Sequence, residues 1–257
     1  MPVKTELGLA GAVVLVTGGV RGVGRGITEV FLAHGAHVVA CARREAPTEA
    51  EFAACDVRDE TQVAALVEGI VERHGRLDVV VNNAGGAPYV SAADASPRLH
   101  EKVVQLNLLA PLLVAQHANA VMQRQECGGS IVMISSVSGT RPSPGTAAYG
   151  AAKAGLDNLT ASLAVEWAPK VRVNALDVGM VRTEQAHLHY GSAAAVEAVG
   201  KTVPLGRLAE PAEIGHCAAF LASGLASYVS GATLRVHGGG EVPAFLAAAD
   251  VNHREDS

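Results

Sequence analysis

The chain alternates short runs of apolar, often β-branched residues with longer segments of helical periodicity, and this alternation restricts its possible folds most. The first apolar run covers residues 12–16, helical spacing follows over residues 23–34, and the alternation continues to residues 233–236. Short apolar runs are typical of strands that are buried on both faces of a parallel sheet. The pattern predicts an α/β protein with a Rossmann-type doubly wound parallel sheet of about seven strands and helices on both faces.

The same criteria place the remaining elements. Further strands are expected at residues 37–42, 77–81, 130–135 and 171–176, and further helices at residues 60–74, 147–168 and 210–221. The segment 43–51 is short and contains Pro47, so we expect at most one turn of helix there, because a parallel crossover normally needs about a dozen residues.

Composition and length favour one domain over residues 1–257. Hydrophobic residues make up 49% of the 257 residues and charged residues 18%, which suits a large α/β core. No linker divides the chain, and the polar residues 250–257 are expected to fray. The four cysteines form no CxxC pair, so neither a disulfide framework nor a metal site is expected.

Charge and hydropathy limit the partners. The net charge is −5 with interspersed signs, which does not favour nucleic acid as a partner. Every apolar stretch is interrupted before it could span a bilayer, and the N-terminus has no signal-peptide pattern. We therefore expect a cytoplasmic protein whose partner is a small-molecule substrate, with neither membrane nor nucleic acid involved.

A glycine-rich turn, TGGVRGVG at residues 17–24, separates the first strand from the first helix. Glycines let the backbone approach a pyrophosphate, and the helix N-terminus offers free N–H groups and a positive dipole. Although glycine also serves ordinary tight turns, its position between a strand and a helix favours dinucleotide binding.

This turn resembles the TGxxxGxG motif of the short-chain dehydrogenase/reductase family. Further motifs of that family occur in order: Asn82-Asn83-Ala84-Gly85 after the expected strand at residues 77–81, Asn107 on a long helix, Ser136 after the expected strand at residues 130–135, and Tyr149 with Lys153 in YxxxK. The resemblance covers essentially the whole chain. It implies an enzyme that transfers a hydride between a nicotinamide cofactor and a carbonyl or alcohol carbon, and a homotetramer or homodimer.

Tyr149 and Lys153 lie four residues apart on an expected helix and therefore share one face. An ammonium near a phenol stabilises the phenolate, so we expect Lys153 to lower the pKa of Tyr149 and Tyr149 to act as the acid/base. Ser136 would hydrogen-bond the substrate oxygen. The resemblance implies that Asn107 kinks its helix and holds a water. The candidate catalytic set is Asn107, Ser136, Tyr149 and Lys153.

The cofactor is expected to be NADP(H), with NAD(H) possible. Ala42 holds the position where NAD-binding folds commonly place an acidic residue, and Arg43 could cover a 2′-phosphate together with Arg21. Glu45 could weaken such a site, and Arg43 could instead stack on adenine. The expected cofactor contacts are Gly18, Arg21, Gly22, Val23, Gly24, Arg43, Asp56, Val57, Asn83, Ala84, Gly85, Tyr149, Lys153, Gly179, Val181 and Thr183.

The chain departs from the family pattern at two positions: Val178 replaces the usual proline before Gly179, and His237 replaces a frequent aspartate. The segment 184–201 is expected to form a substrate lid. The pocket candidates are mainly small and apolar, which favours a neutral substrate: Gly86 to Tyr89, Ser138, Pro142 to Thr146, Val181 and Leu188.

Two alternatives remain open at this stage. One is an NAD-dependent alcohol dehydrogenase of the same family, and the other is a non-catalytic nucleotide sensor on the same fold. A sugar epimerase shares YxxxK but usually needs a larger C-terminal domain than this chain can supply. The sequence does not name the substrate.

Overall fold

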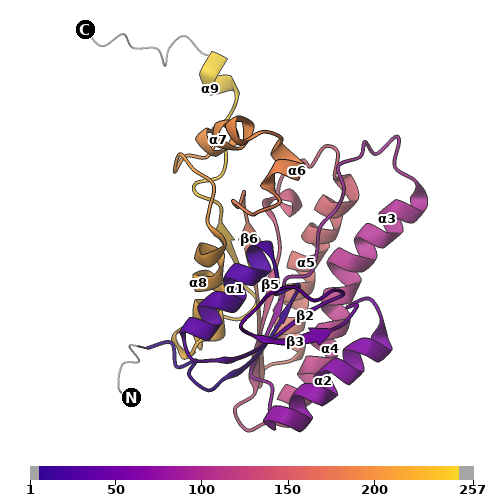
Figure 1. Cartoon of the computed structure of the whole chain (residues 1–257), viewed down its shortest axis with the longest axis vertical. Coiled ribbons are helices and arrows are strands. Elements are labelled where there is room, and N and C mark those ends of the chain that lie inside the picture. The colour runs from indigo at the N-terminus through magenta and orange to yellow at the C-terminus, as the bar shows by residue number, and fades with distance from the viewer. Residues whose placement is uncertain (1–5, 249–257) are drawn as a thin grey trace.

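A seven-stranded parallel sheet forms the centre of the molecule (Figure 1), a computed structural model that describes residues 6–248. The strand order is β3-β2-β1-β4-β5-β6-β7, and every neighbouring pair is parallel. The strands are β1 (Val13–Thr17), β2 (His37–Ala42), β3 (Glu51–Ala54), β4 (Val79–Asn82), β5 (Gly129–Ile134), β6 (Val171–Val178) and β7 (Thr233–Val236). The predicted Rossmann-type fold is confirmed.

Helices cover both faces of the sheet. One face carries α1 (Gly22–Ala33) and α8 (Pro211–Ala222), which supply Phe31 and Ile214 to the core. The other carries α2 (Glu60–His74), α4 (Ala110–Met122) and α5 (Ala147–Glu166), whose core residues include Val114 and Leu156. The remaining helical segments are α3 (Pro97–Val104), α6 (Ala186–Tyr190), α7 (Ala193–Lys201), α9 (Phe245–Ala248), a π-helical turn (Gln105–Leu109) and two 3₁₀ turns (Val137–Gly139 and Gly224–Ala226).

The helix at residues 60–74 lies where the sequence predicts it, because a capping residue precedes its first turn and a glycine follows its last turn. Asp59 caps the first turn by accepting a hydrogen bond from the backbone N–H of Gln62 (3.1 Å), and Gly75 ends the helix with a φ of 74°. The carboxylate satisfies an otherwise unpaired N–H, and glycine adopts the left-handed conformation without a steric penalty.

The connection from β2 to β3 agrees with the expectation of at most one helical turn, but the strand that follows it was not predicted. Residues 43–50 form no helix, and β3 pairs in parallel with β2 directly after this short loop. The sequence did not reveal β3, because this edge strand is only partly buried and its segment EFAA lacks an apolar β-branched run. A partly solvated edge strand does not need the continuous apolar run of a central strand.

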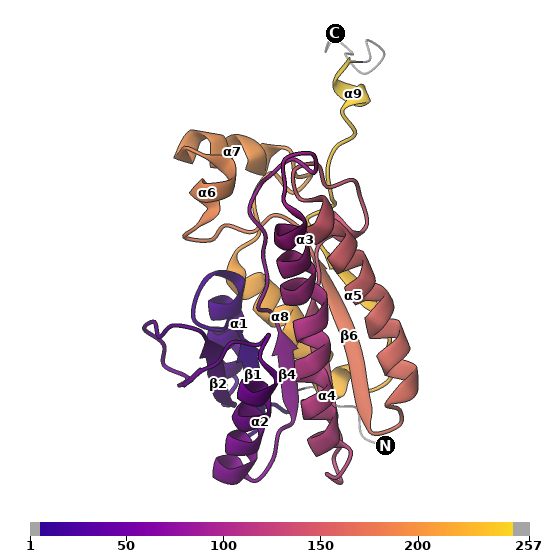
Figure 2. The same cartoon turned by 90° about the vertical axis from the view of Figure 1, so that its right-hand side faces the viewer.

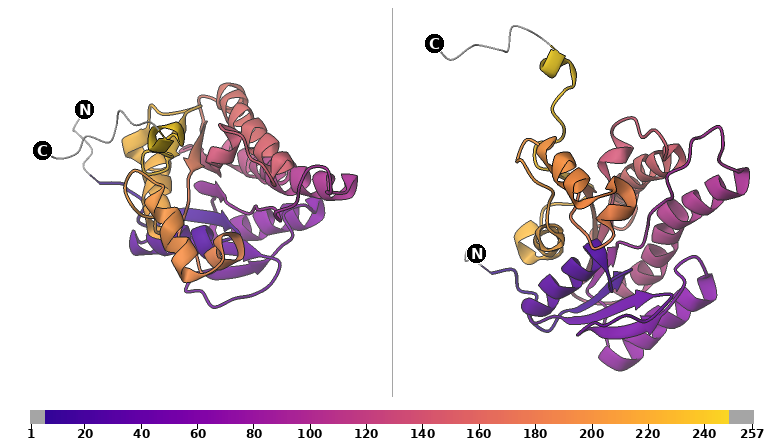
Figure 3. Two further views of the ribbon diagram at one scale, coloured as in Figure 1. Left: turned by 90° about the horizontal axis from the view of Figure 1, so that it is seen from above. Right: turned by 45° about the horizontal axis from the view of Figure 1, so that its top comes forward.

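The order of the strands reverses between β1 and β4, and a cleft at such a switch point is where doubly wound sheets bind ligands. The segments α6 and α7 lie beyond the carboxyl ends of the strands, above this point (Figure 2). Seen from above and from an intermediate tilt, they lie across the end of the sheet (Figure 3). The elements that carry the glycine turn and the expected lid therefore meet at one end of the molecule.

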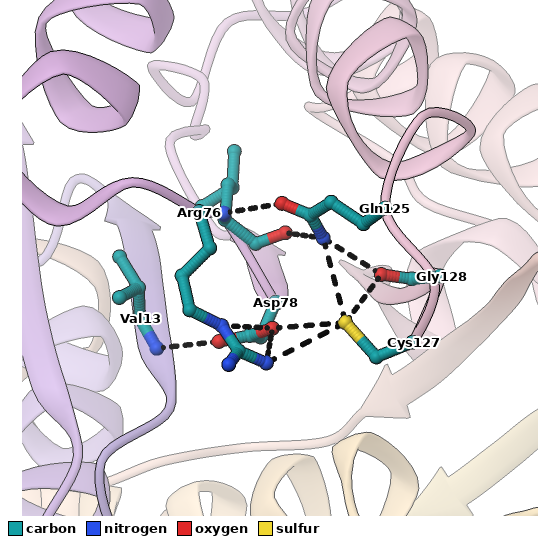
Figure 4. Close-up of polar contacts among 7 residues, drawn as sticks. Val13, Arg76, Asp78, Gln125, Cys127 and Gly128 are labelled. Carbon is teal, nitrogen blue, oxygen red and sulfur yellow. Dashed lines mark hydrogen bonds and ion pairs between the residues drawn. The ribbon is translucent and has the colours of Figure 1, made fainter.

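A polar cluster closes the opposite end of the sheet (Figure 4). Asp78 Oδ2 accepts a hydrogen bond from the backbone N–H of Val13 (2.9 Å), and its Oδ1 accepts two from Arg76 (2.9 and 2.6 Å). Gln125 bonds both backbone groups of Leu77 (2.8 and 3.0 Å), and the Cys127 thiol lies 3.4 Å from Arg76 Nη2. These contacts join the starts of β1 and β4 to the turn before β5, and thereby hold the sheet register at the end away from the cavity.

No helix within residues 6–248 could cross a membrane, and no group of three or more His, Cys, Asp or Glu side chains in that range is placed to hold a metal ion. The polar tail 250–257 lies outside the described residues.

Candidate active site

The glycine turn approaches the end of β4 so closely that a side chain is excluded. A Cβ atom on Gly24 would lie 2.1 Å from the backbone oxygen of Gly18 and 2.4 Å from Asn83 Nδ2. Asn83 Nδ2 itself donates to the backbone oxygens of Thr17 (2.9 Å) and Gly18 (3.2 Å). Thr17 Oγ1 accepts hydrogen bonds from the backbone N–H groups of Asn83 and Ala84, both at 3.0 Å. The turn is thus fixed in a shape that leaves its backbone open to a ligand.

A cavity of about 770 Å³ extends from this turn across the carboxyl ends of the strands. Its size suits a dinucleotide with space for a small substrate. All sixteen expected cofactor contacts line it: Gly18, Arg21, Gly22, Val23, Gly24, Arg43, Asp56, Val57, Asn83, Ala84, Gly85, Tyr149, Lys153, Gly179, Val181 and Thr183. Their assignment as contacts remains a prediction, but the fold brings them to one cavity.

Three of the four candidate catalytic side chains also line the cavity. Tyr149 and Lys153 share one face of α5, with Lys153 Nζ 5.6 Å from the centroid of the Tyr149 ring. The Tyr149 hydroxyl is hydrogen-bonded to Ser136, which follows β5. A hydroxyl, a phenol and an ammonium therefore converge on one point of the wall.

Tyr149 titrates differently from our expectation. Removal of the phenol from water raises its pKa above the ordinary value, and the hydrogen bond with Ser136 offsets only part of this rise. The negative charge of Asp177 acts in the same direction as burial, as does the Tyr190 phenol once it has lost its proton. We expected Lys153 to lower this pKa, but burial exceeds any such effect, because removal from water penalises the phenolate. Tyr149 is therefore protonated at neutral pH and suited to donate a proton.

Lys153 is almost fully buried, and burial lowers the pKa of its ammonium to about 8. The charge of Asp157 opposes this shift in part. The ammonium donates a hydrogen bond to the backbone oxygen of Ile134 (2.7 Å), which fixes its position beside the end of β5. The charge is thus present at pH 7 and is lost within the range in which many enzymes are assayed.

Asn107 lies behind the cavity wall and does not line it. It occupies the π-helical turn between α3 and α4, where its Nδ2 donates to the backbone oxygens of Val103 and Gly86, both at 2.9 Å. Its Oδ1 accepts from the backbone N–H of Gly86 (2.8 Å). A Cβ on Gly85 would lie 2.7 Å from Asn107 Oδ1 and 3.5 Å from Lys153 Nζ, so Asn107 and Lys153 flank the same glycine. The π-helical turn interrupts the long helix at this asparagine, and such turns often occur near functional sites.

The end of the cavity at β2 is rich in guanidinium groups. Arg21 and Arg43 line it as expected, together with Arg44 and Arg58, which the sequence analysis did not name. Arg58 donates to both carboxylate oxygens of Asp56, and this contact, assisted by the charge of Arg43, lowers the pKa of Asp56. Since Arg58 is paired, Arg21 and Arg43 remain the better candidates for an anionic ligand. Arg58 could have been identified from the sequence as a residue of this site, because it lies two residues after Asp56, an expected cofactor contact.

A buried carboxylate near the site was missed. Asp177 on β6 is fully buried; its Oδ2 lies 3.4 Å from Thr140 Oγ1 and 3.7 Å from Arg235 Nε, and its Oδ1 has no hydrogen-bond partner. Burial raises its pKa, while Arg235, Thr140 and His237 oppose that rise. The replacement of aspartate by His237, which the sequence left unexplained, thus places a basic ring near this carboxylate.

The expected substrate pocket divides between two places. Gly86 lines the main cavity, whereas Ser138 and the segment from Pro142 to Pro144 line a second hollow of about 520 Å³. Tyr89 is 78% exposed and lies against Gly145, and Leu188 is 68% exposed. Glu184, Gln185, Ala186, His189 and Tyr190 line the main cavity from the expected lid.

Comparisons with known proteins agree with this geometry. The family model described as enoyl-(acyl carrier protein) reductase matches residues 18–241. A protein of Sinorhizobium fredii, the uncharacterized short-chain type dehydrogenase/reductase y4vI, is 37% identical over 241 residues; the match covers 89% of this chain but 43% of that protein, so this chain spans less than half of that relative. Oxidoreductase UcpA of Escherichia coli O157:H7 is 35% identical, covering 91% of this chain and 96% of its own length.

A solved structure shares the fold. The ligand-free structure of Thermoplasma acidophilum aldohexose dehydrogenase superposes with a TM-score of 0.86 at 31% identity, covering 91% of this chain and 95% of that one. The match thus covers most of a chain that also has the cavity at the strand reversal, the glycine turn and the Ser-Tyr-Lys arrangement. The protein belongs to the short-chain dehydrogenase/reductase family and is an oxidoreductase of that family, which uses a nicotinamide cofactor.

Proposed function

We propose that this oxidoreductase is NADP(H)-dependent and interconverts a carbonyl and a secondary alcohol on a small, mostly apolar substrate. The observation that carries the proposal is the convergence of Ser136, Tyr149 and Lys153 on one point of the cavity wall. The bound nicotinamide would supply or accept the hydride. The tight cradle at Gly24 suits the pyrophosphate in the middle of such a cofactor, and the arginines at the β2 end of the cavity suit its adenosine end.

Proton transfer is the task of the protein. In reduction, Tyr149 donates its hydroxyl proton to the substrate oxygen as negative charge develops there, and Ser136 donates a hydrogen bond to the same oxygen. Lys153 stabilises the phenolate that remains, because its ammonium charge lies close to the ring. Asn107 holds the backbone at Gly85 and Gly86, and so fixes the part of the wall that lies next to Lys153.

The preference for NADP(H) rests on Arg21 and Arg43 together with the absence of an acidic residue at Ala42. A 2′-phosphate would bind their guanidinium groups through charge-assisted hydrogen bonds. Glu45 also lines this end of the cavity. Its charge favours the second candidate function, an NAD-dependent alcohol dehydrogenase of the same family.

Removal of the Arg43 guanidinium separates these candidates. We expect Arg43→Ala to weaken NADPH binding by about 10- to 100-fold, because a hydrogen bond to a charged group contributes about 1.5–3 kcal/mol. NADH binding should change by less than about threefold. Nicotinamide fluorescence measures both affinities, and Arg98→Ala, which removes an exposed arginine on α3, is the matched control. Equal losses for the two cofactors would contradict a role in 2′-phosphate binding.

The substrate is proposed only by class. The cavity near Gly86 and Val181 offers small and apolar side chains and favours a neutral ketone or alcohol. Because one structural relative is an aldohexose dehydrogenase, aldoses belong in the first substrate screen beside apolar ketones. The non-catalytic sensor is disfavoured because Asn107, Ser136, Tyr149 and Lys153 are all present.

A cytoplasmic homotetramer, formed by one domain with a lid at residues 184–201, is part of the same proposal. Two sets of exposed apolar side chains support two separate interfaces: Leu109 and Val165 on the side of α4 and α5, and Phe220 and Leu234 on the side of α8 and β7. Two different two-fold interfaces generate a closed tetramer. We expect light scattering to give four times the chain mass of 26.2 kDa. A monomer in that measurement would contradict this part of the proposal.

A further inference from the structure

Helix α1 begins without a capping side chain from its own segment. Arg21 occupies the N-cap position but makes no side-chain hydrogen bond there, and the first turn of the helix contains no acidic residue. The N–H groups of a first helical turn have no partner within the helix and carry partial positive charge. They therefore require an acceptor from elsewhere.

Glu184 supplies that acceptor from a segment 162 residues away. The backbone N–H of Gly22 points to its carboxylate, with 3.0 Å to Oε1 and 3.3 Å to Oε2. The preceding residue, Thr183, packs against the same glycine: a Cβ on Gly22 would lie 3.5 Å from its Cγ2. The base of the expected lid thus rests directly on the glycine turn.

A cofactor pyrophosphate would accept a hydrogen bond from the same donor, the backbone N–H of Gly22. Dinucleotides place their pyrophosphate on the N-terminal N–H groups of the helix that follows the first strand, and both Gly22 and Glu184 line the cavity. A carboxylate and a pyrophosphate cannot share one N–H, and their negative charges repel each other. We propose that Glu184 is a built-in competitor of the cofactor pyrophosphate and a latch that holds the lid base on the glycine turn until the cofactor displaces it.

The neighbouring contacts confine the displacement to the lid. Before the latch, the chain is anchored: the backbone N–H of Arg182 bonds to Ala209 (2.8 Å), and its guanidinium lies 3.4 Å from Glu210 and 3.7 Å from Glu197. After the latch, α6 begins at Ala186, and His187 Nδ1 lies 3.1 Å from the backbone oxygen of Glu184. Release of Glu184 therefore acts on α6 rather than on β6, and it couples cofactor binding to the position of the lid.

The test is a titration of Glu184→Gln with NADPH and NADH. Since the inference rests on the nicotinamide site of the proposed function, wild-type protein is titrated in parallel. We expect both cofactors to bind about threefold to tenfold more tightly, by the same factor, because the repelled group is the pyrophosphate common to both. Adenosine 2′-monophosphate, which lacks a pyrophosphate, should bind with unchanged affinity. Glu166→Gln makes the same charge change at an exposed position at the end of α5, away from the lid, and should leave all three affinities unchanged.

A second measurement needs no cofactor. Glu184→Ala removes the acceptor of the Gly22 N–H, so hydrogen–deuterium exchange of that amide and of the amides in residues 184–201 should accelerate, while exchange in β5 stays the same. Unchanged exchange at Gly22 would show that the latch does not form.

The outcomes separate the two proposals. If wild-type protein binds neither cofactor, the proposed function fails. If wild-type protein binds and Glu184→Gln binds equally or more weakly, the competitor role of Glu184 is wrong while the cofactor site stands. Tighter binding of NADPH alone would place Glu184 near the 2′-phosphate instead, and would also overturn the inference.

Discussion

Replacement of Tyr149 by phenylalanine is expected to lower kcat for carbonyl reduction by about 10²- to 10⁴-fold, the usual contribution of a positioned proton donor. Phenylalanine keeps the ring that lies beside Lys153 and removes only the hydroxyl that is hydrogen-bonded to Ser136. The cavity wall therefore retains its shape. NADPH affinity should stay within about threefold, since the deleted atom is the one aimed at the substrate. Stopped-flow absorbance of NADPH oxidation measures the chemical step, and fluorescence titration measures binding.

Ser136→Ala provides the graded comparison for this result. It removes a hydrogen-bond donor from the developing charge, and we expect a smaller loss than that of Tyr149→Phe, because the proton donor remains. Without Ser136, the pKa of Tyr149 should rise further, since this hydrogen bond is the contact that lowers it. Full activity of Tyr149→Phe with a verified carbonyl substrate would exclude the phenol as proton donor and would leave the convergence of side chains without a catalytic role.

The elements that the sequence predicted are those with strong local signals. The helix at residues 60–74 has a capping aspartate and a terminal glycine, and β2 and β7 lie at the predicted residues. The edge strand β3 was missed because it is only partly buried, and an apolar run is required only of a strand covered on both faces. The strand at residues 171–176 was predicted two residues too short, because Asp177 interrupts its apolar run although it is fully buried.

The sequence predicted which residues form the site, but it did not predict how burial shifts their pKa values. The order of the motifs placed Ser136, Tyr149 and Lys153 in one cavity, yet residue spacing does not report removal from water. The rise in the pKa of Tyr149 follows from burial, which depends on how α5 packs against the ends of β5 and β6. The contact between Glu184 and Gly22 joins residues 162 positions apart and has no local signature in the sequence.

The buried ammonium of Lys153 affects both the catalysed reaction and the folding stability of the protein. Substitution Lys153→Met keeps the length and apolar stem of the side chain and removes the charge. We expect kcat/KM for reduction to fall by about 10²- to 10³-fold, as for loss of a group that stabilises developing charge. In the wild type, kcat/KM should itself decline above about pH 8, where the ammonium loses its proton. The profile of the variant should lack this decline. A wild-type profile that is flat from pH 7 to 9.5 would contradict a role for this charge.

The same variant should be more stable than the wild type at pH 7. Folding lowers the pKa of Lys153 from 10.5 to about 8, so the folded state holds this proton less tightly than the unfolded chain. The difference corresponds to roughly 3 kcal/mol of destabilisation below pH 8. Loss of the bond to Ile134 offsets about 1 kcal/mol, which leaves a net gain of about 2 kcal/mol for Lys153→Met.

The sign of this effect reverses with pH. Between pH 8 and 10.5 the unfolded chain binds the proton and the folded chain does not, so wild-type stability rises with pH relative to the variant. The advantage of Lys153→Met should shrink through this window and vanish before pH 10.5, where the wild type becomes more stable by the roughly 1 kcal/mol of the bond to Ile134. Chemical denaturation of both proteins at pH 7, 9 and 10.5 measures the difference. A constant difference at all three values would mean that the ammonium is not destabilised by burial, whereas a shrinking one would show that the chain retains a costly buried charge because its chemistry requires it.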